Sequence, residues 1–377
     1  MDSEAEGETP PGGRPPAEPD VFRAQFPVLD RLAYLNAGTE GPVPRAAADA
    51  ASARISSELS AGRCGRPYFE ELMALAADLR ARYAAALGCD FTSVALTGST
   101  TDGVNTVIAG LDLRPGDEVL TTDEEHPGLL APLARARIRH GITVRVVPWE
   151  ELAAAASSST RLIACSHVSW VSGRVMDVPA LAASGAPVLL DGAQGLGAIP
   201  VNVGALGCAF YAASGQKWLC GPEGSGCLFV ARDHVEDLLI PWPSYGSVAR
   251  GSDPLELVPG EGATRFDHGF PPGVRSAWAL AALKVLETPG WEWVHDRGAE
   301  LAAALAAGLE ARGLEVAPRG RSTLVSWRVE DPEAEVERLA RSGVFVRSIP
   351  GRGLVRASVG AWSSVQDVEA VTHHAVV

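Results

Sequence analysis

Short apolar runs alternate with longer Ala- and Leu-rich stretches through most of the chain. The short runs are rich in β-branched residues and predict strands, and helical stretches such as 102–111 and 127–139 fit between several of them. Strands that alternate with helices form a mostly parallel sheet with helices on both faces, so we expect an α/β fold. The seven predicted strands are Ser93–Thr97, Glu118–Thr122, Thr143–Val147, Leu162–Ser166, Val188–Asp191, Ala209–Ala213 and Cys227–Val230.

The pattern changes towards both ends of the chain. Residues 1–20 are rich in Pro, Gly and Glu and predict a disordered tail, whereas residues 45–87 predict helix that is broken near 62–67. After a long Ala- and Leu-rich stretch, shorter elements predict a small α+β domain with strands at 323–329, 344–349 and 354–359, a helix at 333–341 and a C-terminal tail. Turn residues cluster at 288–290. We therefore place a large domain at 21–288 and a small one at 289–377.

Composition narrows the possible partners and compartment. The 32 Lys and Arg residues against 46 Asp and Glu give a net charge of −14, which argues against nucleic acid and anionic membranes as partners. No apolar run is long enough to span a membrane, and the first twenty residues do not resemble a secretion signal. The six cysteines include no CxxC pair and do not resemble a disulfide framework. We therefore expect a cytoplasmic protein.

Reactive side chains follow several of the predicted strands. Asp191 ends one strand, Lys217 follows another, the hydroxyl-rich turn 97–101 precedes a helix, and His126 follows a fourth strand. Ligands bind at the carboxyl ends of parallel strands, so these groups are expected at one edge of the sheet. The chain has only two lysines, Lys217 and Lys284, and arginine cannot replace lysine as a neutral amine.

Each of these residues taken alone is most often a helix cap or a surface group. Together they match the needs of pyridoxal 5'-phosphate. Its aldehyde forms a Schiff base with a lysine, its ring nitrogen needs an acidic partner, and its phosphate suits a helix N-terminus. The sequence therefore predicts this cofactor.

Three stretches closely resemble one known family. They are SHVSWVSG (166–173), LLDGAQGLGAIPV (189–201) and FYAASGQKWLCGPEGSGCLFV (210–230). They are similar to the class V aminotransferases of pyridoxal-phosphate fold type I, which include cysteine desulfurases, isopenicillin N epimerase-like proteins and cysteine/cystine C–S lyases. The resemblance runs from about Phe26 to near the C-terminus. It implies a homodimer with active sites at the subunit interface, and we expect a small-molecule substrate that is a sulfur-containing amino acid.

The resemblance also implies roles for individual residues. Lys217 corresponds to the Schiff-base lysine, Asp191 to the partner of the ring nitrogen, Gln194 to a neighbour of the phenolate oxygen and His126 to the group stacked on the ring. The phosphate ligands would be Ser99, Thr100, Thr101, Ser214 and Gln216. The substrate-binding residues would be Arg347 and Arg356, which hold the carboxylate, together with Trp170 and Asn36.

Some positions depart from the family pattern. Many relatives have His where this chain has Gln216, and desulfurases usually have Asn where it has Trp170, as expected of the C–S lyase branch. In relatives, a Thr in the segment equivalent to 265–270 reaches the partner subunit's phosphate. This chain has RFDHGF there, so the resemblance does not extend to that contact.

The cysteines and the C-terminal segment bear on the reaction. Desulfurases need a cysteine on a mobile loop of the C-terminal part, and this sequence has none after Cys227. Residues 346–358 instead resemble the cyst(e)ine C–S lyases. We therefore expect β-elimination on cysteine or an S-substituted cysteine, giving thiol or persulfide, pyruvate and ammonia, in a setting such as specialised metabolism. Lys217 would remove the Cα proton while Asp191 keeps the ring nitrogen protonated.

Other outcomes remain open. The same family carries out transamination, epimerisation and decarboxylation, and a second alternative is a non-catalytic binding descendant of the fold. A dinucleotide enzyme is disfavoured because the glycine-rich run 221–226 precedes a strand instead of opening a helix. We expect no metal site, since His373 and His374 are adjacent and do not face the same way.

Overall fold

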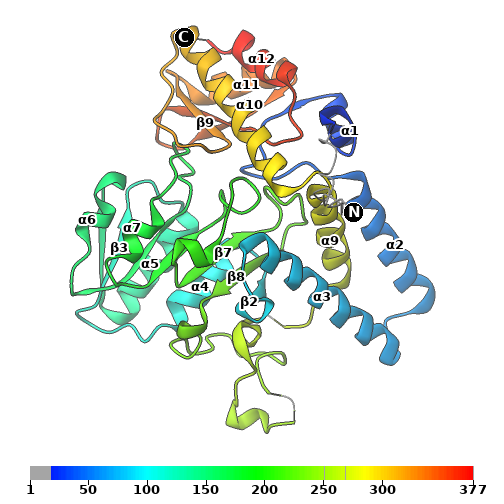
Figure 1. The fold of residues 1–377 in the computed structure, drawn as a ribbon, viewed down its shortest axis with the longest axis vertical. Helices are drawn as coiled ribbons and strands as arrows, with labels where there is room; N and C mark the ends of the chain where they lie inside the picture. The colour runs from blue at the N-terminus through cyan, green and yellow to red at the C-terminus, as the bar shows by residue number, and fades with distance from the viewer. Residues whose placement is uncertain (1–17, 250, 268, 377) are drawn as a thin grey trace, which may run out of the picture.

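The computed structural model describes residues 18–249, 251–267 and 269–376, and all seven predicted strands lie in one sheet (Figure 1). Their order is β2-β8-β7-β6-β5-β3-β4. Strand β8 is antiparallel to β2 and β7, and every other neighbouring pair is parallel. This confirms the predicted α/β fold. The bounds are β2 Val94–Thr97, β3 Glu118–Thr122, β4 Thr143–Val147, β5 Thr160–Ser166, β6 Val188–Asp191, β7 Phe210–Ser214 and β8 Gly226–Val230.

The central strands are buried on both faces, which explains their continuous apolar sequence. In β6, Leu190 packs into one hydrophobic core and Leu189 into a second core on the opposite face. Tyr211 and Phe210 alternate between the same two cores in β7. Two layers of helices are therefore needed to cover the sheet.

Helices supply both layers. The first core includes side chains from α3 (Gly65–Leu87), α6 (Leu152–Ala155), α7 (Val178–Ala182), α8 (Val203–Leu206) and α9 (Gly273–Glu287). The second includes side chains from α4 (Thr100–Gly110) and α5 (Pro127–His140). Helix α2 (Arg45–Ala61) packs along α9. The helix break predicted at 62–67 is shorter in the structure, where only residues 62–64 separate α2 from α3 and residues 65–67 are helical. None of the helices in the described part is long and apolar enough to cross a membrane.

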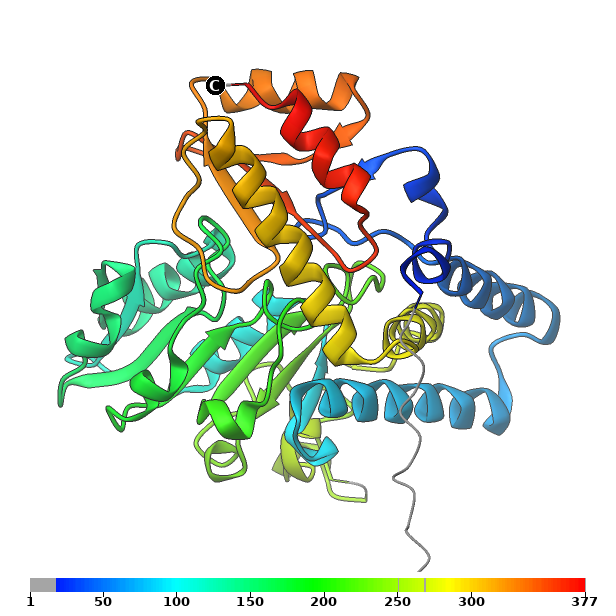
Figure 2. The same ribbon diagram turned by 45° about the horizontal axis from the view of Figure 1, so that its top comes forward.

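A second, antiparallel sheet lies above the ends of the central strands (Figure 2). Its order is β11-β12-β9, and it shares a hydrophobic core with three helices. The prediction of a C-terminal tail is wrong, because His373 and His374 belong to the last of these helices. The bounds are α10 Trp291–Ala311, β9 Leu324–Arg328, α11 Pro332–Arg341, β11 Arg347–Ile349, β12 Leu354–Ser358 and α12 Val365–His374.

The N-terminal segment joins this C-terminal part. Strand β1 (Ala33–Tyr34) pairs in parallel with β10 (Val344–Phe345), and Asn36 forms an isolated bridge with Ser358. Most of the predicted tail lies outside the described residues, but α1 (Pro19–Arg23) begins inside it, so its last two residues are helical. The helix break between α9 and α10 falls where the sequence predicts a domain boundary, and the division into two domains stays a prediction.

Candidate active site

Lys217 and Asp191 lie close enough for each charge to act on the other. Asp191 ends β6, and Lys217 follows β7, which is the next strand in the sheet. Burial lowers the pKa of Lys217 to about 8, and the negative charge of Asp191 opposes that shift. Burial raises the pKa of the Asp191 carboxyl, and the charge of Lys217 opposes this in turn. An amine that is partly neutral near physiological pH thus lies within electrostatic range of a buried carboxyl group.

Asp191 has spare capacity to bind a cation. Its Oδ1 accepts the N–H of Ala193 at 3.0 Å, and the carboxylate has no ion-pair partner within 4.0 Å among the described residues. A buried carboxylate is stable as an anion when a cation or further donors reach it. A protonated ring nitrogen meets that need, so the residue fits the predicted cofactor.

Hydroxyl groups gather where α4 begins, beside the end of β7. The Thr100 N–H donates to Ser214 Oγ at 3.0 Å, and the hydroxyls of these two residues are 2.7 Å apart. Ser99 caps the helix by accepting the N–H of Asp102 at 3.1 Å. Thr101 is exposed on the first turn, and a Cβ added at Gly128 would lie 2.6 Å from its Oγ1. This N-terminus offers hydroxyls and a helix dipole to a phosphate.

His126 caps α5 and packs against Trp170. Its Nδ1 accepts the N–H of Gly128 at 3.0 Å, so the neutral ring carries its proton on Nε2. The ring centroids of His126 and Trp170 are 4.9 Å apart with the planes nearly perpendicular. Burial, with the positive charges of Lys217, Arg347 and Arg356, lowers the pKa of His126 to about 4. The ring is therefore neutral at physiological pH.

Two glutamines belong to the site, Gln194 after β6 and Gln216 directly before Lys217. The Gln194 amide donates to the carbonyl of Gly38 at 2.8 Å and accepts from Trp218 Nε1 at 2.9 Å. Gln216 has a buried Oε1 without a hydrogen-bond partner among the described residues. A Cβ added at Gly38 would lie 2.7 Å from Ser358 Oγ and 2.9 Å from Gln194 Oε1, so only glycine fits there without rearrangement.

Arg356 is fully buried, and none of the carboxylates in the described residues forms an ion pair with it. Its Nη1 donates to the carbonyl of Trp170 at 2.8 Å, and its Nε and Nη2 have no partner in the described part of the chain. Burial, and then the charge of Arg347 opposite it on β11, lower the pKa of Arg356 to about 9. Buried guanidinium nitrogens without acceptors indicate an anionic ligand.

Arg347 and Asn36 are linked through Thr39. Arg347 Nη1 donates to Thr39 Oγ1 at 3.2 Å, and that hydroxyl donates to Asn36 Oδ1 at 2.9 Å. The Arg347 guanidinium lies 5.9 Å from the centre of the Trp170 ring. Asn36 is therefore linked to Arg347 through the Thr39 hydroxyl.

Sequence reasoning missed several residues of this site. The sequence patterns give no role to Thr39, Ser358 or Glu125. Glu125 is buried, and it accepts from Thr122 Oγ1 at 2.5 Å, Ser166 Oγ at 2.6 Å and the Ser166 N–H at 2.9 Å. Burial raises its pKa to about 7. Its place between a strand and His126 was the one available signal.

The segment with the unusual RFDHGF sequence is anchored within the same chain. Asp267 binds Arg80 at 2.6 Å and accepts the N–H of Leu96 at 2.8 Å. His268 lies outside the described residues.

Comparison with known proteins identifies the family. Residues 34–371 match the family model "Aminotransferase class-V". The chain belongs to this class-V aminotransferase family. A probable cysteine desulfurase of Pseudomonas aeruginosa is 30% identical to this class-V chain, over 93% of it and 96% of the relative.

Solved structures of the family have the same fold. The cystine C-S lyase C-DES, solved in complex with its reaction product cysteine persulfide, is 27% identical with a TM-score of 0.87, over 93% of this chain and 98% of C-DES. A mutant of C-DES with glycine covalently linked to the PLP cofactor matches equally well. The cysteine desulfurase CsdA of Escherichia coli is 26% identical with a TM-score of 0.84, over 95% and 97% of the two chains.

These findings confirm the predicted family, the fold-type I architecture and pyridoxal 5'-phosphate as the cofactor. They also confirm the predicted enzyme class, a carbon–sulfur lyase that depends on this cofactor.

Proposed function

We propose that this enzyme catalyses β-elimination on cysteine or an S-substituted cysteine, with thiol or persulfide, pyruvate and ammonia as products. The observation that carries the proposal is the Arg356 guanidinium, buried with two unpaired nitrogens and close enough for its charge to lower the pKa of Lys217. An amino acid whose carboxylate binds there brings its Cα to the amine. The desulfurase and C-S lyase relatives support a sulfur-containing substrate.

The residues of the site fit the cofactor, and each has a proposed part in holding it. Asp191 would bind the ring nitrogen, and His126, as a neutral aromatic ring, would stack on the ring. Gln194 would donate to the phenolate oxygen, and the phosphate would be held by Ser99, Thr100, Thr101, Ser214 and Gln216. When bound, pyridoxal phosphate supplies an aldehyde that condenses with amines and a ring that delocalises negative charge.

The chain's own side chains would perform the proton transfer. Lys217 Nζ, with its pKa lowered by burial to about 8, is a base that can accept the Cα proton near neutral pH. Arg356 and Arg347 would fix the carboxylate, and the neutral His126 ring and the Trp170 indole would exclude water from one side. Asn36 would act through Thr39 to orient Arg347.

The cysteines support elimination without a persulfide on the protein. Cys165, Cys208, Cys220 and Cys227 are buried, and burial raises the pKa of each thiol, to about 12 in Cys208. Thiols with raised pKa values are poor nucleophiles. The sulfur would therefore leave with the departing group.

The experiment is incubation of purified holoenzyme with S-substituted cysteines. We expect pyruvate and free thiol in equal amounts, no product from Lys217→Ala, and an unchanged rate for Cys64→Ser, which alters the one exposed cysteine. Alanine with protein-bound sulfur would identify a desulfurase instead, and recovered amino acid with inverted Cα would identify an epimerase.

A homodimer and a cytoplasmic location complete the proposal. Three aromatic side chains form an exposed cluster, the arm surface, which we define as Phe69, Tyr245 and Phe270. Apolar surface of this kind favours association with a second copy. The cysteines are free in the structure, as they would be in a reducing compartment.

A further inference from the structure

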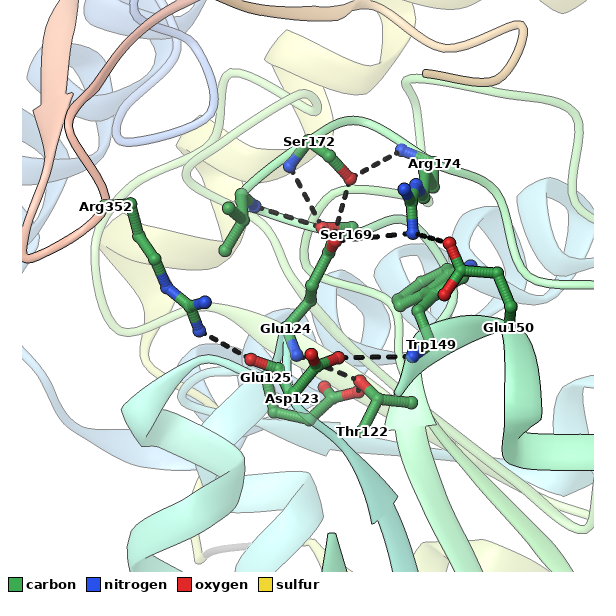
Figure 3. Close-up of polar contacts among 11 residues, drawn as sticks. Thr122, Asp123, Glu124, Glu125, Trp149, Glu150, Ser169, Ser172, Arg174 and Arg352 are labelled. Carbon is green, nitrogen blue, oxygen red and sulfur yellow. Dashed lines mark hydrogen bonds and ion pairs between the residues drawn. The ribbon is translucent and has the colours of Figure 1, made fainter. Parts of the chain in front are cut away.

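Glu124 lies between β3 and α5, two residues before His126, and its carboxylate binds one turn of the 166–173 motif (Figure 3). Ser172 Oγ donates to Oε2 at 2.6 Å, and Ser169 Oγ donates to the same oxygen. Arg174 Nη1 lies 3.6 Å from Oε1. The Glu124 side chain is only 14% exposed. Two serines of this turn and the arginine that follows it therefore converge on a mostly buried carboxylate.

The Ser169 hydroxyl connects Glu124 to the backbone of this turn. While it donates to Glu124, its oxygen accepts the N–H groups of Val171 at 3.2 Å and Ser172 at 3.1 Å. The turn is closed by the Gly173 N–H, which donates to the Ser169 carbonyl at 3.0 Å. An ionised acceptor orients the hydroxyl proton and leaves the oxygen lone pairs for the backbone. The carboxylate thus stabilises the conformation of residues 169–173.

This turn places the Trp170 carbonyl against Arg356, the residue proposed to bind the substrate carboxylate. The Trp170 carbonyl accepts from Arg356 Nη1 at 2.8 Å, and no other hydrogen bond holds that guanidinium among the residues that the structure covers. A guanidinium is planar and rigid. A hydrogen bond to one of its nitrogens therefore also fixes the directions in which its other nitrogens donate. The direction of Nε and Nη2 therefore depends on the conformation of the turn.

We propose that Glu124 is a positioning residue for the substrate carboxylate: it holds the 169–173 turn, whose Trp170 carbonyl aims the Arg356 guanidinium. The inference rests on the proposed function, in which Arg356 binds that carboxylate. Glu124 itself does not touch the substrate. The same arginine that approaches Glu124, Arg174, also binds the more exposed Glu150, which contacts neither serine and so offers a matched control.

The test compares two ligands on the holoenzyme by titrating the cofactor absorbance. Glycine has a carboxylate but no leaving group at Cβ, and ethylamine has no carboxylate. Glu124→Gln keeps the shape of the side chain but loses its charge, so we expect glycine to bind about tenfold more weakly, the usual effect of losing a charged hydrogen bond. Ethylamine binding should stay within about twofold, since it makes no use of Arg356. In turnover, KM should rise while kcat changes little.

Three further variants separate positioning from a general structural effect. Glu150→Gln should bind both ligands as the wild type does. Ser172→Ala removes one donor to Glu124 and should weaken glycine in the same direction, by a smaller factor. In an Arg356→Gln background, Glu124→Gln should cause no further loss, because the effect passes through Arg356.

Equal weakening of glycine and ethylamine by Glu124→Gln would overturn the inference, and so would a full further loss in the Arg356→Gln background. If Arg356→Gln weakens glycine but Glu124→Gln does not, only the role of Glu124 fails. If Arg356→Gln binds glycine as the wild type does, the proposed role of Arg356 is wrong, and the inference about Glu124, which depends on it, is wrong as well.

Discussion

Lys217 can be observed directly, because the chain has only one other lysine. Burial lowers the pKa of Lys217 to about 8. In the apoprotein, the neutral fraction of this amine should rise through pH 8, well below the range of an ordinary lysine. We expect pulse labelling with acetic anhydride, followed by peptide mapping, to show half-maximal reactivity of Lys217 near that pH. Lys284 serves as the internal reference.

Two charged neighbours of Lys217 shift its pKa in opposite directions, so variants of each neighbour should shift the labelling midpoint in opposite directions. Asp191 raises the pKa of Lys217 and Arg356 lowers it. The midpoint should therefore move down in Asp191→Asn and up in Arg356→Gln. A midpoint in the ordinary lysine range in all three proteins would contradict the burial of the amine.

At the scale of single residues, the sequence predicts which side chains belong to the site better than it predicts the contacts between them. The acid, amine and hydroxyls at the strand ends follow from local patterns, since strand ends can be recognised from the chain. The bond from Arg356 to the Trp170 carbonyl joins residues 186 positions apart, and no local pattern encodes it. The same is true of Glu124, whose partners lie on another loop.

Helix α4 lies so close to the sheet that one of its residues must be glycine. A Cβ added at Gly103 would lie 2.8 Å from the Cβ of Ala212 in β7. Gly103→Val should therefore push the helix away from the strand and move Thr100 from Ser214. We expect a loss of about 2–3 kcal/mol in the free energy of unfolding, typical of overpacking, and weaker binding of pyridoxal phosphate to the apoprotein.

Urea denaturation and a fluorescence titration with the cofactor would measure these two effects. Asn105→Val, on a more exposed face of the same helix, is the control for the change in helix propensity. If the two variants lose equal stability, contact with the sheet is not the cause.

Among the elements, the strands were easier to predict than the last helix. Buried parallel strands form uninterrupted apolar runs between turns, which single them out. Helix α12 is short and contains several β-branched residues, which hide its period. Ser364 and Asp367 form a capping box at its start, and this sequence signal was available.

For the whole molecule, the arm surface provides a test of the proposed homodimer. The segment between β8 and α9, drawn in yellow-green in Figure 1, projects from the body and carries Tyr245, which is 86% exposed. We expect the wild type to behave in light scattering as two copies of a 39.3 kDa chain. Tyr245→Glu combined with Phe270→Glu should shift it towards one copy, because a charge in an apolar interface is poorly tolerated.

Ile138→Glu alters an equally exposed apolar residue on α5 and should leave the mass unchanged. Dissociation by Ile138→Glu alone would place the interface on another face of the molecule.

The pairing of β1 with β10 has a consequence for synthesis. The partners Ala33 and Val344 are more than three hundred residues apart, so β1 cannot pair with β10 until more than three hundred further residues have been synthesised. Residues 35 and 36 then hydrogen-bond or bridge to Ser358, two positions after Arg356. Asp191 and Lys217 come from segments translated much earlier. A nascent chain would thus complete the strands that carry the amine and its carboxylate partner before it gains the arginines proposed to bind the substrate carboxylate.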